Sequence, residues 1–362
     1  MHIQIEQAKL ANLLSKAVNL VEKRNTIPIL SNVLLSTDDG KLTCTATDLD
    51  AQVTATTDAT VTTHGATTVS AALFAQVVGK LPKGKLITLT DKDGKLTVQS
   101  GSAVFDFATL PAEDFPELAS SEFEATFTAS GAEFKRLFDL SAFCQSDEAT
   151  RYYLNGVYLH NHEGTARAVA TDGHRLARID SKINAQFPGV IVPRKVVGEL
   201  RKLIGDDDVT VHISETKMRV TSGDVVLTSK VIDGTFPDYS RVIPQGNDNV
   251  FTANANDMKA ASDLVALMSS ERTKAVRMSF AGGECTLEVA GADSNKGCEV
   301  VAVEQDGADV VIGFNSRYMA DALSHVSTDR VVLRIGNGGS AAIITPEGDA
   351  SVLYITMPMR VN

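Results

Sequence analysis

The fold is decided by the stretch Phe127-Thr128-Ala129-Ser130-Gly131-Ala132-Glu133-Phe134-Lys135-Arg136-Leu137, whose pattern occurs twice more in the chain. Ile3-Gln4-Ile5-Glu6-Gln7-Ala8-Lys9-Leu10 lies 124 residues earlier, and Phe251-Thr252-Ala253-Asn254-Ala255-Asn256-Asp257-Met258 lies 124 residues later. Each copy predicts a short strand, a polar cap and a helix with its apolar residues on one face. Three copies predict three similar modules, each long enough to have its own core.

The pattern also restarts inside a module. The sequence Asp-Gly-Lys-Leu-Thr occurs at 39–43 and again, letter for letter, at 93–97. Asp-Gly between alternating apolar residues is a hairpin signal. Each module is therefore predicted to be two halves, each with a strand, a helix and further strands, which makes an α+β protein. The six helices are predicted at 7–21, 70–81, 131–140, 193–204, 257–268 and 316–326.

Two similar connectors separate the modules. Phe115-Pro116-Glu117 and Phe236-Pro237-Asp238 lie 121 residues apart. Proline favours a stiff, extended segment, and the aromatic residue is expected to pack into a module. The predicted modules are residues 1–118, 119–243 and 244–362.

Composition excludes several classes of protein. No apolar run approaches the ~20 residues that span a membrane, and no basic segment precedes an apolar one at the N-terminus, so a cytoplasmic protein is expected. The four cysteines form no CxxC pair and are expected to be reduced. His160 and His162 share one side of a predicted strand and could hold a metal ion, but a solvated strand edge is the favoured interpretation. We therefore expect no metal and no cofactor.

The net charge of −11 argues at first against nucleic acid as a partner. The predicted helices, however, are net positive, and the rest of the chain is correspondingly more acidic. If the helices share one surface, that surface attracts a polyanion. The alternative is that helices carry Lys and Arg for their helix propensity. Because no aromatic residues are interleaved with the basic ones for base stacking, any contact with DNA is expected to be to phosphate and independent of base sequence.

An active site is not predicted. Thr171-Asp172-Gly173-His174-Arg175 groups an acid, a base and a cation, which a hydrolase could use. The same Asp recurs at 48 and 293 in the other modules, so it is interpreted as a turn residue at a strand end. An exposed binding site fits better, and a peptide-binding scaffold without DNA is a second hypothesis. The tail Met357-Pro358-Met359-Arg360-Val361-Asn362 is apolar enough to join such a site, or it packs on its own module.

Motifs over the whole chain resemble the β sliding clamps of bacterial DNA polymerase III. They are Pro28-Ile29-Leu30-Ser31-Asn32, Arg151-Tyr152-Tyr153-Leu154-Asn155-Gly156, Ala170-Thr171-Asp172-Gly173-His174-Arg175-Leu176, Phe236-Pro237-Asp238-Tyr239 and Met357-Pro358-Met359-Arg360. The resemblance implies the DNA clamp fold, in which each module has two helices and two antiparallel sheets. It implies a non-catalytic protein, which encircles duplex DNA as a head-to-tail homodimer and tethers DNA polymerase III for processive replication. The implied partners also include other polymerases, a clamp loader and repair proteins.

The resemblance also implies three sets of site residues. DNA contacts are expected at Arg24, Arg151, Tyr152, Tyr153, Arg194 and Lys195. A pocket between the second and third modules is expected to bind short apolar peptides through Leu154, Thr171, Gly173, His174, Arg175, Leu176, Pro237, Arg241, Val242, Asn315, Tyr318, Met357, Pro358, Met359 and Arg360. The dimer seam is expected to join Phe105 and Phe107 to Leu267 and Met268 of the second copy. The chain departs from related clamps at Ala72, Thr273, Gly339, Ala341 and Asn362.

Overall fold

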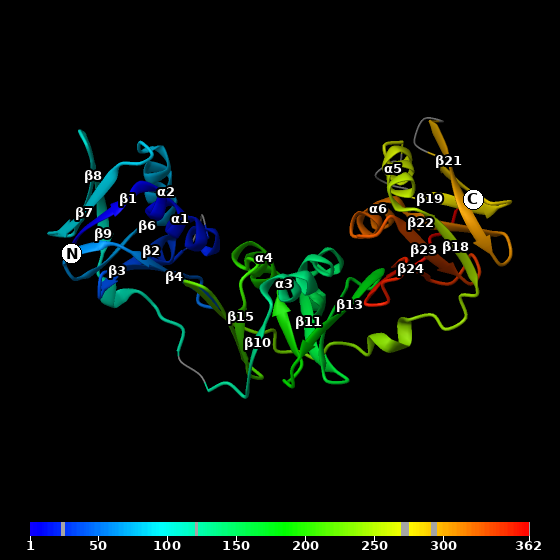
Figure 1. Ribbon diagram of the computed structural model, residues 1–362, viewed down its shortest axis with the longest axis horizontal. Helices are drawn as coiled ribbons and strands as arrows, with labels where there is room; N and C mark the ends of the chain where they lie inside the picture. Colours follow the sequence, from blue (N-terminus) through cyan, green and yellow to red (C-terminus); the bar gives the residue numbers. More distant parts are fainter. Residues whose placement is uncertain (23–25, 120–121, 269–274, 291–294, 362) are drawn as a thin grey trace. The chain divides into compact units, whose positions relative to one another are not determined.

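The computed structural model describes residues 1–22, 26–119, 122–268, 275–290 and 295–361 (Figure 1). It divides into two compact units, one of residues 1–135 and 185–231 and the other of residues 136–184 and 232–362. The sheets of the middle module are shared between the units. The chain therefore has three modules in sequence but two units by contact.

Six α-helices lie in the described residues, as the repeat predicts. They are α1 (Gln7–Ala17), α2 (Ala71–Lys80), α3 (Gly131–Asp139), α4 (Arg194–Leu203), α5 (Ala255–Ala266) and α6 (Ser316–Ser324). Within their units, α1 contacts α2 and α5 contacts α6, and Figure 1 shows each pair side by side.

Four predicted helix ends were wrong by more than one residue. The helix predicted at 7–21 ends at Ala17 because a 3₁₀ turn, Val18–Leu20, replaces its last part. The helix predicted from residue 257 already begins at Ala255, since the Asn254 side chain accepts hydrogen bonds from the backbone of Asn256 and Asp257 and caps the first turn. It ends at Ala266, and the helix predicted to reach residue 326 ends at Ser324.

The first unit contains one continuous antiparallel sheet in the order β10-β15-β16-β17-β4-β3-β2-β6-β9-β8-β7-β1-β5. The strands of the first module are β1 (His2–Glu6), β2 (Asn32–Asp38), β3 (Lys41–Thr47), β4 (Ala51–Asp58), β5 (Thr60–Thr63), β6 (Ala66–Ser70), β7 (Leu86–Lys92), β8 (Lys95–Ser100) and β9 (Ala103–Leu110). The middle module contributes β10 (Ala125–Ala129), β15 (Val209–Ile213), β16 (Lys217–Ser222) and β17 (Val225–Lys230), and β14 (Val190–Pro193) precedes α4.

The second unit contains a sheet in the order β11-β12-β13-β25-β24-β23-β18-β21-β20-β19-β22. Its strands from the middle module are β11 (Gly156–His162), β12 (Thr165–Thr171) and β13 (Arg175–Asn184). Those of the third module are β18 (Asn249–Asn254), β19 (Ala275–Ala281), β20 (Glu284–Ala290), β21 (Lys296–Asp306), β22 (Val310–Asn315), β23 (Arg330–Ile335), β24 (Ala342–Pro346) and β25 (Val352–Thr356).

Modules are joined by strand pairing. In the first joint, β17 of the middle module pairs antiparallel with β4 of the first, and in the second joint β25 of the third module pairs with β13 of the middle one. The joints match in detail, because the Lys230 amide donates to the Asp50 carbonyl at 2.8 Å and the Met357 amide donates to the His174 carbonyl at 2.9 Å. Backbone hydrogen bonds therefore fix both joints in the same way.

The connectors pack as predicted. Phe115 and Phe236 are both buried, and the Phe236 ring stacks on Tyr158 with the ring centroids 4.9 Å apart. A 3₁₀ turn, Ala112–Asp114, precedes Phe115 in the first connector, and another, Tyr239–Val242, follows Phe236 in the second.

Candidate functional site

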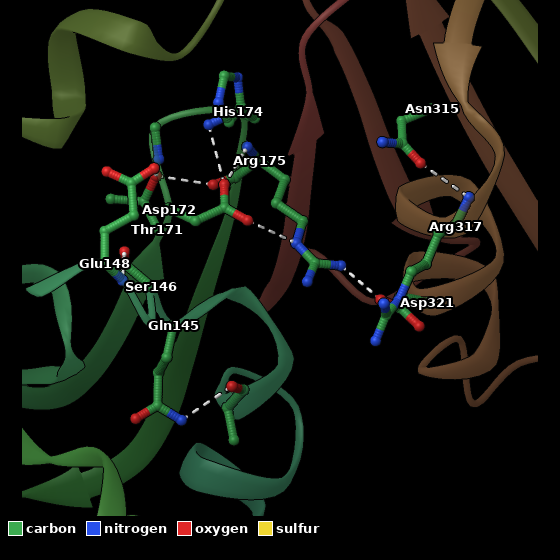
Figure 2. Close-up of polar contacts among 12 residues, drawn as sticks. Gln145, Ser146, Glu148, Thr171, Asp172, His174, Arg175, Asn315, Arg317 and Asp321 are labelled. Atoms are coloured by element: carbon green, nitrogen blue, oxygen red, sulfur yellow. Dashed lines mark hydrogen bonds and ion pairs between the residues drawn. The ribbon is translucent and has the colours of Figure 1, made fainter. Parts of the chain in front are cut away.

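The turn between β12 and β13 is the centre of the candidate peptide site. One carboxylate oxygen of Asp172 accepts hydrogen bonds from the backbone amides of His174, at 2.9 Å, and Arg175, at 3.0 Å (Figure 2). Gly173 has a φ of +87°, a conformation in which residues other than glycine are strained. The Thr171 hydroxyl closes the turn by donating to the Arg175 carbonyl at 2.7 Å.

The interpretation of Asp172 as a turn residue is supported by its counterpart in the first module. The Asp48 carboxylate accepts from the amides of Asp50 and Ala51, and Leu49 has the positive φ that Gly173 has in the middle module. Asp293 of the third module lies outside the described residues. Because both oxygens of Asp172 are used in holding the turn and Arg175, the carboxylate is poorly placed to act as a general base.

Arg175 is enclosed by the joint between the middle and third modules. Its Nε donates to Asp172 at 3.0 Å, and its Nη1 donates to Asp321 of α6 at 2.5 Å (Figure 2). The guanidinium carbon also lies over the rings of Tyr318, 4.4 Å from its centroid, and Phe143, at 5.4 Å. The side chain is only 11% exposed. Its donors are therefore directed at protein groups, and Asp321 and Phe143 are site residues that the sequence did not reveal.

Arg151 also contacts this turn. It pairs with Glu148 at 3.2 Å and donates to the Asp172 carbonyl at 3.3 Å. Its Nη1 lies 2.7 Å from the place where a Cβ on residue 173 would stand, so Gly173 leaves room for the guanidinium. Of its predicted DNA-contacting neighbours, Tyr152 is 54% exposed. A residue predicted to touch DNA thus supports the turn predicted to bind peptide.

The C-terminal tail is bound to two modules. The Met357 amide bonds to His174 in the middle module, and the Met359 amide donates to the Gly313 carbonyl on β22 at 2.8 Å. A side chain on residue 313 would lie 2.5 Å from the Met359 carbonyl oxygen, so the tail needs glycine there. Met357 itself is 46% exposed. The tail therefore does more than pack on its own module.

The structure brings one part of the predicted peptide site together. The His174 and Tyr318 rings lie 6.4 Å apart, Asn315 caps α6 through the Arg317 amide, and Met357 bonds to the turn. The other predicted members differ in exposure: Leu154 and Leu176 are buried, Thr171 and Pro358 are half-buried, and Arg360 is exposed. Pro237, Arg241 and Val242 lie on the second connector. There Arg241 forms an ion pair with Asp238, and Val242 is exposed.

The predicted DNA contacts in the first unit lie at the start of α4. Lys195 forms an ion pair with Asp48 of the first joint and lies 3.6 Å from Glu22. Arg194 is the first residue of the same helix. Arg24 lies outside the described residues, as do Thr273 and Asn362 of the departures from related clamps. Lys195 is thus held by carboxylates at the first joint.

Of the residues predicted for a dimer seam, Phe105 and Phe107 lie on β9, and Leu267 and Met268 follow α5. In the part of the chain that the structure describes, residues 103–108 of β9 pair only with β8, and residues 296–302 of β21 pair only with β20. Phe105 is 41% exposed, whereas Phe107 is buried against Phe74. Leu267 and Met268, after α5, are 79% and 39% exposed.

The described residues contain no group of three or more side chains placed to hold a metal ion. Both ring nitrogens of His160 already have partners, the Asn161 carbonyl and the Tyr239 hydroxyl. All four cysteines are free, and Cys298 alone is exposed. Among the helices of the described residues, none is both long and apolar enough to cross a membrane.

Comparison with known proteins identifies relatives over the whole chain. Models of the DNA polymerase III beta subunit match in three parts, the N-terminal domain at residues 1–119, the central domain at 128–238 and the C-terminal domain at 240–360. The Beta sliding clamp of Caulobacter vibrioides is 38% identical, with 100% of both chains covered, and that of Escherichia coli K12 is 35% identical, with 99% of this chain and 100% of the relative covered.

Solved structures agree. The sliding clamp of Bartonella birtlesii bound to griselimycin is 41% identical with a TM-score of 0.96, and that of Pseudomonas aeruginosa bound to griselimycin is 33% identical with a TM-score of 0.96. Both comparisons cover 100% of each chain.

Proposed function

Because this chain belongs to the family of the DNA polymerase III beta subunit, the beta sliding clamps, we propose that two copies close head to tail around duplex DNA and tether a DNA polymerase. The family is non-catalytic. The observation that carries the proposal is that β9 and β21 have open edges at the strand positions that form both internal joints. A cytoplasmic location stays a prediction from the sequence.

The internal joints predict how the two edges pair. Gln52 is the first residue of β4 that pairs back to β3, and Lys296 is the first residue of β21 that pairs back to β20. Thr228 and Asp106 are each the fourth residue of their strands, β17 and β9. Since Gln52 pairs with Thr228, Lys296 of one copy would pair with Asp106 of the other, which places opposite charges together.

The same register brings apolar residues together. It places Phe105 opposite Gly297, where the Met268 side chain lies 3.2 Å from the position of a Cβ. Phe105 of one copy would therefore pack against Met268 of the other. A head-to-tail contact gives a ring only if its rotation returns to the start, and the proposed ring closes after two copies, which have six modules.

The register can be tested by a disulfide. It places the exposed Cys298 opposite Val104, at a separation of about 4.5–5.5 Å between Cα atoms, which a disulfide can bridge. We expect oxidation of the Val104→Cys variant to give a covalent dimer, and Cys298→Ser to abolish it. Ala108→Cys is the matched control, because residue 108 lies on the same face about 13 Å along the strand. Equal cross-linking of both variants would contradict the register.

Encirclement is tested by loading the Val104→Cys variant on nicked circular plasmid with a clamp loader and oxidising it only afterwards. A closed ring stays on the circle in high salt and leaves when the plasmid is cut, since topology rather than phosphate contact holds it. Equal retention on circular and linear DNA would refute encirclement. We propose Arg24, Arg151, Tyr152, Tyr153, Arg194 and Lys195 as the weak contacts with DNA.

We also propose that partner proteins insert short apolar segments at the turn Thr171–Arg175, beside Tyr318 and Met357. The exposed Met357 and the rings of His174 and Tyr318 supply the apolar contact that such groove recognition uses. Griselimycin is a suitable probe, because relatives are known bound to it. Met357→Ala should weaken its binding, and Leu264→Ala, an exposed aliphatic residue on α5, should not. Unchanged affinity of Met357→Ala would remove the site from this turn.

A further inference from the structure

We propose that Asp321 is a positioning residue of the peptide site, a role that rests on the proposed function. Asp321 lies on α6 of the third module, whereas the turn that it serves belongs to the middle module. Its carboxylate reaches the turn through the side chain of Arg175, the last residue of the turn. It acts through Arg175, whose Nη1 it binds at 2.5 Å.

A continuous series of bonds runs from Asp321 to the tail. Arg175 joins the carboxylates of Asp321 and Asp172 through different nitrogens (Figure 2). Asp172 in turn fixes the His174 amide at 2.9 Å, and the His174 carbonyl holds the Met357 amide at 2.9 Å. These bonds fix where the backbone of Met357 lies relative to α6, and so where its exposed side chain stands.

The surroundings of Arg175 make this arrangement rigid. The guanidinium lies over Tyr318 and Phe143, and the side chains of Arg175 and Asp172 are only 11% and 16% exposed. The planar fork of arginine can bind two carboxylates at once, which the single ammonium of lysine does less well. Without the Asp321 charge, one arm of a nearly buried cation loses its partner, and the turn loses its fixed position.

The first joint achieves a similar result with the charges arranged differently. There the turn residue Asp48 binds Lys195, which the helix α4 of the next module supplies directly. In the second joint the helix supplies the acid and the turn supplies the cation. Both joints therefore have an ion pair between the turn and the second helix of the next module. In the second joint, Asp321 is the helix residue of that pair.

The test compares Asp321→Asn, which removes the negative charge, with Asp321→Glu, which keeps it. We expect Asp321→Asn to speed hydrogen exchange at the Met357 amide at least about 10-fold and to weaken griselimycin binding about 10-fold, with Asp321→Glu near the unaltered protein. Asp263→Asn is the matched control, because Asp263 forms an ion pair with Lys259 on α5 of the same unit. It should change neither quantity.

Arg175→Lys provides a second, independent variant, because it keeps the charge but not the fork. It should speed exchange at Met357 as Asp321→Asn does, and adding Asp321→Asn to it should have little further effect. Exchange at Met357 that stays as slow as in the unaltered protein in both folded variants would overturn the proposal. If the unaltered protein fails to bind griselimycin, the peptide site is refuted, and the exchange result still decides the role of Asp321.

Discussion

Replacing Gly173 by alanine is expected to lower the free energy of unfolding in two ways. The first is the backbone, since a φ of +87° costs a residue with a Cβ about 1–2 kcal/mol. The second is the Arg151 guanidinium, whose Nη1 lies 2.7 Å from the new Cβ and must move. Moving it breaks the hydrogen bond to the Asp172 carbonyl, which contributes about 1 kcal/mol.

Gly164→Ala is the matched control. Gly164 lies in the turn between β11 and β12, has a φ of +90°, and has open space where a Cβ would stand. It should therefore show the backbone cost alone. For a unit of this size, the additional ~1 kcal/mol in Gly173→Ala corresponds to an unfolding midpoint about 2–4 °C below that of Gly164→Ala.

Thermal unfolding and griselimycin titration together test this reasoning. Gly173→Ala should lower both the midpoint and the affinity, because the displaced Arg151 no longer supports the turn. Gly164→Ala should lower the midpoint only. Identical midpoints for the two variants, with unchanged affinity in Gly173→Ala, would refute the contact between Arg151 and Gly173.

Three further predictions concern single residues. Burial lowers the pKa of His160, so the unfolded chain binds more protons than the folded chain as the pH falls below about 6.5, and the free energy of unfolding falls with the pH. Urea unfolding at several pH values should show a weaker dependence on acid pH in His160→Gln. Maleimide should label Cys298 alone in the folded monomer, before the seam covers it, and all 4 cysteines in urea, as counted by mass spectrometry. Gly131→Ala should lower the unfolding free energy by about 1–3 kcal/mol, because its Cβ would overlap the Asp207 carbonyl oxygen, whereas Gly198→Ala has open space on α4 and should raise it by about 0.5–1 kcal/mol.

Local signals in the sequence predicted the fold well. The hairpin signals at Asp39-Gly40 and Asp93-Gly94 are turns with positive φ at all four residues. The threefold pattern predicted six helices, and the Phe-Pro connectors predicted buried aromatic residues. These signals succeed because each depends on neighbours a few residues away, which the sequence shows directly.

The contacts of the site were beyond the same reasoning. Asp321 is 146 residues from Arg175, and Asp48 is 147 from Lys195, so no periodicity relates them. The resemblance placed Arg175 among the peptide-binding residues, but the sequence did not show that the fold surrounds its guanidinium with two carboxylates and two aromatic rings. The pairing of β13 with β25 brings Asp321 and Arg175 together, and the pairing of β17 with β4 brings Asp48 and Lys195 together. An unaligned sequence does not reveal which strand edges meet.

The two open edges have a consequence for faulty variants of this protein. Pairing of the two strand edges joins one copy to the next. The rotation between neighbouring copies decides whether the chains close into a ring or continue as an open filament. A substitution that alters that rotation while sparing the edges would still allow association. Such a variant would form open filaments of many chains instead of closed rings of two. Light scattering would detect these filaments even though each chain is still folded.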